Sequence, residues 1–110
     1  MYAYKEKYTL DFSTITHWHE IHQIIKKELD FPHNYGENWD AFWDCLTDMV
    51  NVDAPLNIEI LGVEVLKQKY PDTLEKMIKI LKRLKHWEND YFCDYVKVEI
   101  VLGEARYEIS

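Results

Sequence analysis

Four carboxylates fall on one side of a predicted helix in the middle of the chain. At about 100° per residue, Glu37, Asp40, Asp44 and Asp48 share an arc of about 80°. Carboxylates one turn apart repel by roughly 0.2 to 0.5 kcal/mol per pair, and residues 28 to 66 contain no Lys or Arg to offset them. The helix dipole favours acids only in the first turn, so it does not account for Asp44 and Asp48. We call these four residues the acid face and interpret it as functional, with a simply solvated face as the alternative.

The same carboxylates could also serve in acid–base catalysis or in metal binding. Asp40 and Asp44 could form an acid and base pair, but neighbours on one exposed helix have no obvious pocket to separate their pKa values. With Glu37 they could bind a divalent cation, but the spacing D-x-[DN]-x-[DN]-G is missing. We therefore expect no enzyme activity, no metal and no cofactor.

A group of histidines precedes the acid face. His17, His19 and His22 lie on a predicted helix, but the pattern His-Glu-x-x-His of zinc proteases is absent. No nearby Cys completes a metal site, so we interpret all three as surface histidines.

Bulk properties narrow the class of partner. The 110 residues are 47% hydrophobic and 15% aromatic, which is typical of a single folded domain over residues 1–110. A net charge of −7 disfavours direct binding of nucleic acid or an anionic membrane and suits a basic protein.

Cysteine content favours a reducing compartment. Cys45 and Cys93 are too few for a secreted disulfide framework, and the first ten residues lack the apolar core of a signal peptide. We expect a cytoplasmic protein in which both cysteines are small buried groups, and their redox activity stays open.

Alternating and helical patterns predict the elements that carry these residues. Strands are predicted over residues 2–12, 56–61 and 95–102, and residues 106–109 could pair back after Gly103 as an added antiparallel strand. Helices are predicted from a cap at Thr16 or His17 to Leu29, over 39–50, over 63–70, and from Asp72 or Thr73 to Lys85. Strands separated by helices indicate an α/β fold with a small parallel sheet.

The central stretch resembles a known family, the barstar-like ribonuclease inhibitors. The residues that carry the resemblance are Lys26-Lys27-Glu28-Leu29, Phe31-Pro32, Tyr35-Gly36-Glu37-Asn38, Asp40-Ala41 and Trp43-Asp44-Cys45-Leu46-Thr47. The resemblance implies a three-stranded parallel sheet with about four helices packed on it. It also implies an intracellular immunity protein, monomeric when free, that plugs the active site of a basic ribonuclease or nuclease toxin.

The resemblance also implies a site. Asp44 matches the family position that enters the cationic active site most deeply, and Asp40 matches the position flanking it. We predict that the partner is bound by Asn34, Tyr35, Gly36, Asn38, Trp39, Asp40, Trp43, Asp44, Thr47 and Asp48. We call these ten residues the predicted contact surface.

Local structural roles are the alternative for several of these residues. The role of Gly36 could be limited to ending a turn with positive φ, and the role of Asn38 could be limited to capping the helix. By wheel position Trp39 is expected to face the core and Trp43 the interface.

Two departures from the family pattern bear on the partner. Asn34 stands where the family often has a tyrosine, and Arg83 lies near the position where the last long helix supplies an acid. The resemblance therefore implies a cognate nuclease other than barnase. A barstar-fold interaction module with a partner that is not a ribonuclease is the remaining alternative.

Overall fold

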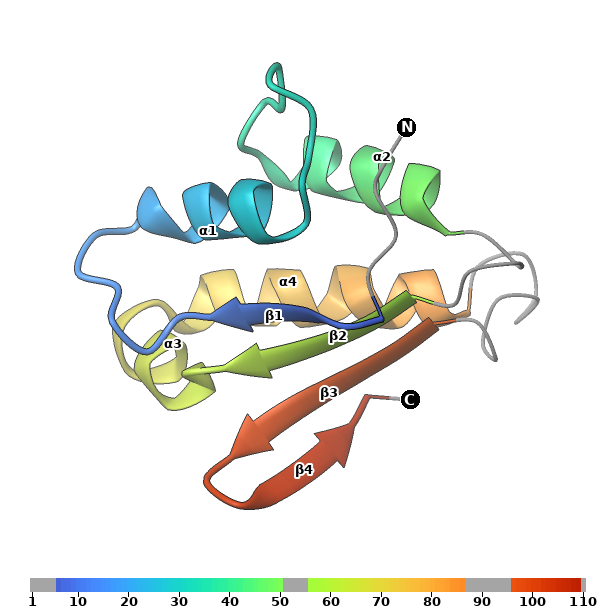
Figure 1. The fold of residues 1–110 in the computed structure, drawn as a ribbon. Coiled ribbons are helices and arrows are strands. Elements are labelled where there is room, and N and C mark those ends of the chain that lie inside the picture. The colour runs from blue at the N-terminus through green and yellow to red at the C-terminus, as the bar shows by residue number, and fades with distance from the viewer. Residues whose placement is uncertain (1–5, 51–55, 87–95, 110) are drawn as a thin grey trace.

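The chain forms a four-stranded sheet with helices packed on one face (Figure 1). A computed structural model describes residues 6–50, 56–86 and 96–109. The elements are β1 (Tyr8–Asp11), α1 (Glu20–Glu28), α2 (Trp39–Met49), β2 (Leu56–Leu61), α3 (Val63–Lys69), α4 (Pro71–Lys85), β3 (Val96–Leu102) and β4 (Ala105–Glu108). The strand order is β1-β2-β3-β4; the first three are parallel and β4 is antiparallel to β3. This confirms the predicted α/β fold, including the added C-terminal strand.

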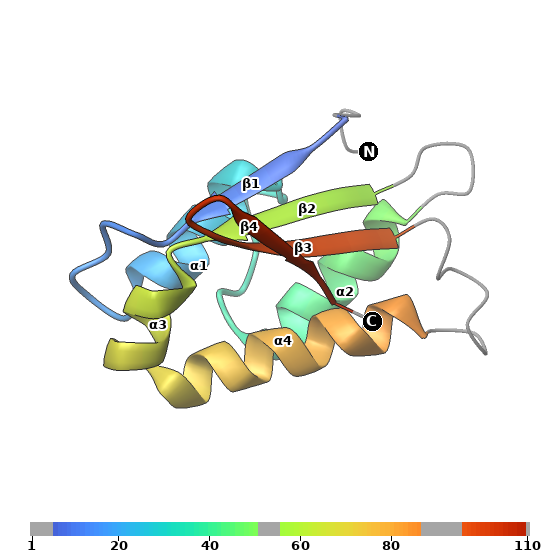
Figure 2. The same ribbon diagram turned by 90° about the horizontal axis from the view of Figure 1, so that it is seen from below.

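Alternation along the strands separates a core face from an open face. Leu10, Ile58 and Val98 point to the helices and are fully or almost fully buried. Figure 2 shows the strands in front of α1 and α2, which lie together behind the sheet. The acid-bearing helix α2 therefore belongs to the helical layer and packs against α4.

A polar network covers the open face. The Glu59 carboxylate accepts hydrogen bonds from Arg106 Nη1 at 2.9 Å and from Thr9 Oγ1 at 2.8 Å. These two bonds, with Lys7 at 3.6 Å, hold the pKa of Glu59 below its usual range. The network fixes β4 against the parallel strands.

The boundaries of α1 differ from the prediction. The helix begins at Glu20, not after a cap by Thr16 or His17. The Glu20 carboxylate instead reaches back and accepts bonds from the backbone N–H groups of Thr16 at 2.7 Å and His17 at 3.3 Å. At the other end, Phe31 N donates to Lys26 O at 3.0 Å, so the chain leaves the helix in a Schellman turn before Pro32.

The start of α4 was also predicted wrongly, and two side chains near the helices have unusual exposure. α4 begins at Pro71, because proline is well suited to the first helical position, and not at a cap by Asp72 or Thr73. Lys85 is buried, with Nζ 3.9 Å from the Glu108 carboxylate. Trp18, which precedes α1, is 49% exposed.

Some expectations lie outside the described residues. They concern the start of the first predicted strand before residue 6, residue 95 at the start of the third, and Cys93. Within the described ranges, no helix combines the length and apolar character that crossing a membrane requires.

Candidate partner-binding site

Helix α2 presents its acids to solvent because its other side is anchored in the core. Phe42 and Leu46 are fully buried and form the apolar side of the helix. Asp40, Asp44 and Asp48 follow the same helical period on the opposite side and are all exposed. Asp40 and Asp44 lie about 6 Å apart along the helix axis, since each residue rises about 1.5 Å.

The three aspartates of the acid face have no charged or hydrogen-bonding side-chain partner within the part of the chain that the structure describes. Among the described residues, no ion pair or side-chain hydrogen bond involves the carboxylates of Asp40, Asp44 or Asp48. Glu37 is exposed as well, but it precedes the cap Asn38 with a φ of 52°, so it lies in the loop before α2 and not on the helix as the periodicity predicted. The repulsion expected from the sequence therefore persists in the fold, and these charges are accessible to another molecule.

Asn38 joins the preceding loop to α2. Its Oδ1 accepts a hydrogen bond from Ala41 N at 2.8 Å, so the expected capping role is confirmed. Its Nδ2 donates to Gly36 O at 3.2 Å. The positive φ expected at Gly36 is instead found at Glu37, with a value of 52°. The turn therefore bends one residue later than predicted, immediately before the cap.

Beneath this loop lies a buried histidine, which corrects the prediction of three surface histidines. His17 and His19 are exposed, but His22 is only 2% exposed. Its Nδ1 lies 2.7 Å from the Tyr35 hydroxyl oxygen, and its ring centroid lies 4.5 Å from that of Trp39. His22 thus connects α1 to both the loop and the first residue of α2.

Protonation states follow from this burial. Burial raises the pKa of the Tyr35 hydroxyl, so this group keeps its proton and can donate it to a neutral imidazole. Burial also lowers the pKa of His22, and the nearby Glu37 carboxylate opposes that effect only in part. His22 is therefore neutral at physiological pH.

This arrangement predicts a pH dependence of stability. Because the folded pKa of His22 lies below its ordinary value of 6.5, folding disfavours the bound proton. The contribution of His22 is complete above pH 6.5 and is lost as the pH falls toward the folded pKa. Urea unfolding from pH 8 to pH 5 should show a smaller loss of stability for His22→Gln than for wild type. His17→Gln, at an exposed position, should retain the wild-type profile; equal profiles for all three proteins would contradict the assignment.

Hydrogen bonds also fix the middle of the loop between α1 and α2. Lys26 Nζ donates to His33 O at 2.9 Å, and Tyr35 N donates to Pro32 O at 2.9 Å. Together with the His22 contact, these bonds hold the loop against α1. The polar groups next to the acid face are therefore presented from a fixed backbone.

Trp43 and Arg83 form the border of the acid face toward α4. The Arg83 guanidinium carbon lies 4.1 Å from the centroid of the Trp43 ring, within the range of a cation–π contact. Arg83 is exposed, whereas Trp43 is half-buried. A positive charge thus lies beside the tryptophan that the sequence assigned to the interface.

The residues of the predicted contact surface lie in the loop and in α2, and they differ in exposure. Its exposed members are Asn34, Gly36, Asn38, Asp40, Asp44 and Asp48, and its half-buried members are Trp39, Trp43 and Thr47. Tyr35 is 6% exposed, so its side chain supports the loop from within. A direct contact of Tyr35 with a partner stays a prediction. Because the side chain is buried, the area of such a contact would be small.

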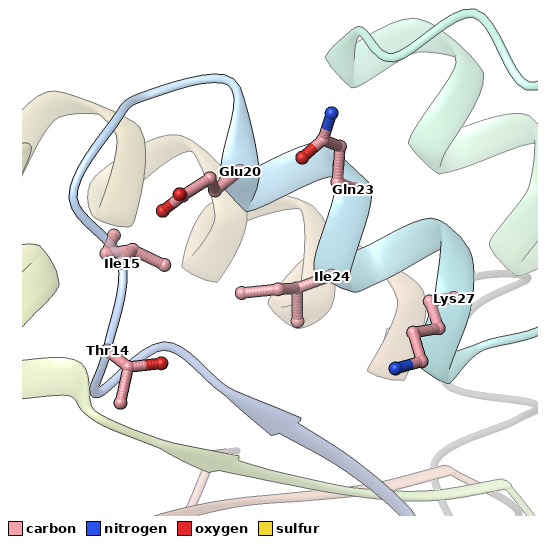
Figure 3. Close-up of a pocket in the computed structure, with 6 residues that line it drawn as sticks. All are labelled: Thr14, Ile15, Glu20, Gln23, Ile24 and Lys27. Carbon is pink, nitrogen blue, oxygen red and sulfur yellow. The ribbon is translucent and has the colours of Figure 1, made fainter.

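Metal ligands do not cluster in the described part of the chain. Among those residues, no group of three or more His, Cys, Asp or Glu side chains is placed to hold a metal ion. A hollow of about 240 Å³ lies beside α1, where Figure 3 shows Glu20 and Ile24 reaching toward Ile15. This hollow is open to solvent, and the Glu20 carboxylate already accepts hydrogen bonds from Thr16 at the start of α1.

Two comparisons with known proteins point to one family. The family model described as "Barstar (barnase inhibitor)" matches residues 6–99. The Bacillus subtilis (strain 168) protein described as "Putative ribonuclease inhibitor YrdF" is 32% identical over 72 residues, which cover 66% of this chain and 77% of that protein. The chain belongs to the barstar family.

Proposed function

We propose that this protein inhibits a basic ribonuclease by inserting the acid face of α2 into the cationic active site. The observation that carries the proposal is the exposure of Asp40, Asp44 and Asp48 without ion-pair partners among the described residues. A protein that leaves adjacent like charges uncompensated loses stability for each pair. A cationic partner offsets that loss on binding.

Mimicry of phosphate is the physical basis of inhibition. Ribonucleases bind the RNA backbone through Arg, Lys and His side chains, and carboxylates accept the same charge-assisted hydrogen bonds as phosphate oxygens. A carboxylate carries no phosphodiester bond that the nuclease can cleave. Asp44, in the middle of α2, would occupy the centre of the cationic site, with Asp40 beside it.

Rigidity of the surrounding surface favours tight binding. The loop is held by Asn38, by the His22–Tyr35 contact and by Lys26, so little conformational freedom remains to be lost on association. The half-buried rings of Trp39 and Trp43 provide preformed apolar area next to the charges.

Arg83 bears on which nuclease is recognised. Its guanidinium would face the rim of the partner's groove, because it is stacked on Trp43 at the border of the acid face. A rim that is cationic throughout would be disfavoured, and a rim with an acidic group would be favoured. We infer a cognate nuclease other than barnase, against which this protein acts as an immunity protein in the cytoplasm of the producing cell.

Titration against a panel of basic ribonucleases tests the proposal. Purified protein is mixed with barnase and with several other basic bacterial ribonucleases, and RNA cleavage is followed by fluorescence. We expect stoichiometric loss of activity for at least one nuclease, with association that slows as NaCl is raised. Full cleavage by every nuclease at a large excess of this protein would count against the proposal.

A further inference from the structure

The β3–β4 hairpin is a part of the molecule that inhibition leaves unexplained. The family match ends at residue 99, whereas β4 spans Ala105–Glu108. In Figure 1 β4 lies at the edge of the sheet far from α2. The hairpin also carries Leu102 and Tyr107, two of the three large hydrophobic side chains that are exposed among the described residues.

β4 presents an open edge to solvent. Ile109 N donates to Val98 O at 2.8 Å, and backbone groups of an antiparallel strand alternate in direction. Tyr107, two residues earlier, therefore directs its N–H and C=O to β3, while those of Arg106 and Glu108 point away from the sheet. All four residues of β4 are exposed, so another strand can reach these groups.

The charges along the β4 edge of one copy are complementary to those along the same edge of a second copy. When two copies of β4 pair antiparallel about Tyr107, Arg106 of each copy lies opposite Glu108 of the other. A two-fold pairing centred on Arg106 or on Glu108 would instead place like charges opposite each other, which is destabilising. Edge strands often carry charges that prevent pairing with another strand. Here Arg106 and Glu108 have opposite signs and are two residues apart, so they favour one register of pairing.

Backbone geometry supports the same register. The outward N–H and C=O groups belong to Arg106 and Glu108, and in this pairing each Arg106–Glu108 pair exchanges both backbone hydrogen bonds. Tyr107 then lies opposite Tyr107 of the second copy, in the position where side chains approach most closely. Hydrogen bonding and charge thus agree on one arrangement.

Arg106 is already oriented for this role. Its Nη1 lies 2.9 Å from Glu59 Oε2 and 3.8 Å from Glu99 Oε1, which fixes the guanidinium over the open face of the sheet. The side chain nevertheless remains 47% exposed, and a guanidinium has further donors for a carboxylate of a second copy.

We propose that two copies of this chain associate through β4, antiparallel and centred on Tyr107, to form one continuous sheet. The acid face of each copy would remain free, because α2 lies away from this edge (Figure 1). The inference does not rest on the proposed function. It departs from the monomer that the sequence led us to expect.

Sedimentation equilibrium of matched charge variants tests the register. With rising concentration the wild-type mass should increase from 13.3 kDa toward twice that value. Glu108 also lies 3.9 Å from the buried Lys85 Nζ of its own chain, so circular dichroism must first show that Glu108→Lys is folded. This variant places Lys opposite Arg106 of the second copy and should weaken the dimer about tenfold. Glu104→Lys makes the same charge change in the hairpin turn and should dimerise like wild type. A wild-type mass that stays at one chain, or equal weakening by both variants, would overturn the proposal.

Disulfide trapping provides a test that does not depend on charge. In the proposed register the Cα atoms of the two Tyr107 residues are about 4.5 Å apart, which suits a disulfide, so Tyr107→Cys should cross-link under mild oxidation. The two Ala105 residues would be about 14 Å apart, so Ala105→Cys should not cross-link. Both variants retain Cys45 and Cys93, which equalises the background. Equal cross-linking of the two variants, or none in Tyr107→Cys, would refute the pairing.

Discussion

Asp44→Ala is expected to weaken binding to the inhibited ribonuclease by about 2 to 5 kcal/mol. This is the usual cost of truncating one partner of a buried, hydrogen-bonded charge pair, and the range rests partly on the complex of barstar itself with barnase. The reason is that nuclease cations desolvated by the inhibitor would lose their carboxylate partner. The change should be measured as a ratio of dissociation constants, with most of the effect in the dissociation rate.

The same substitution should leave the fold intact. Asp44 is exposed and lies one turn from both Asp40 and Asp48, so its removal relieves about 0.2 to 0.5 kcal/mol of repulsion per pair. Urea unfolding should therefore show a stability equal to or slightly above that of wild type. Glu104→Ala, which removes an exposed carboxylate from the far hairpin, should change neither binding nor stability. If both carboxylate variants bound equally well, α2 would not be the binding element.

The acid face could be predicted because it depends only on helical periodicity. Asp40, Asp44 and Asp48 recur at intervals of four, and the apolar partners Phe42 and Leu46 fix which side is buried. No knowledge of distant contacts is needed. The structure places these residues as the pattern predicted, and their role in binding stays a prediction.

His22 could not be assigned from the sequence because its partners are remote. Tyr35 lies in the next loop and Trp39 begins the next helix, and only the turn between them brings both over α1. A histidine beside an apolar stripe gives no local sign of such a contact. The burial of Lys85 could not be predicted for the same reason, since its partner Glu108 is on a strand added at the edge of the sheet.

The strands were easier to predict than the ends of the helices. Alternation in β2 and β3 follows directly from burial of one face, and Gly103, with a φ of 62°, marked the turn into β4. Helix ends depend on which of several nearby groups satisfies the free backbone N–H and C=O groups. In α1 the Glu20 side chain does so, where a Thr or His cap was equally compatible with the sequence.

Gly62→Ala is expected to destabilise the protein by about 2 to 5 kcal/mol without altering the acid face. Gly62 joins β2 to α3 with a φ of 76°, where an alanine costs about 1 to 2 kcal/mol. A Cβ there would also lie 2.2 Å from Ser13 N and 2.6 Å from the carbonyl carbon of Phe12, and relieving such an overlap costs about 1 to 3 kcal/mol more.

Gly103→Ala is the matched control for this effect. Its φ of 62° is similar, but an added Cβ would have no neighbour within 4 Å, so only the conformational cost should remain. Urea unfolding should therefore separate the two variants, and equal losses would contradict the close approach of Ser13 to Gly62. Gly62→Ala should reduce the fraction of protein that is competent to inhibit while the affinity of the folded fraction stays unchanged. Asp44→Ala should instead lower the affinity and leave the folded fraction unchanged. The two variants together therefore distinguish loss of the fold from loss of the charge that the fold positions.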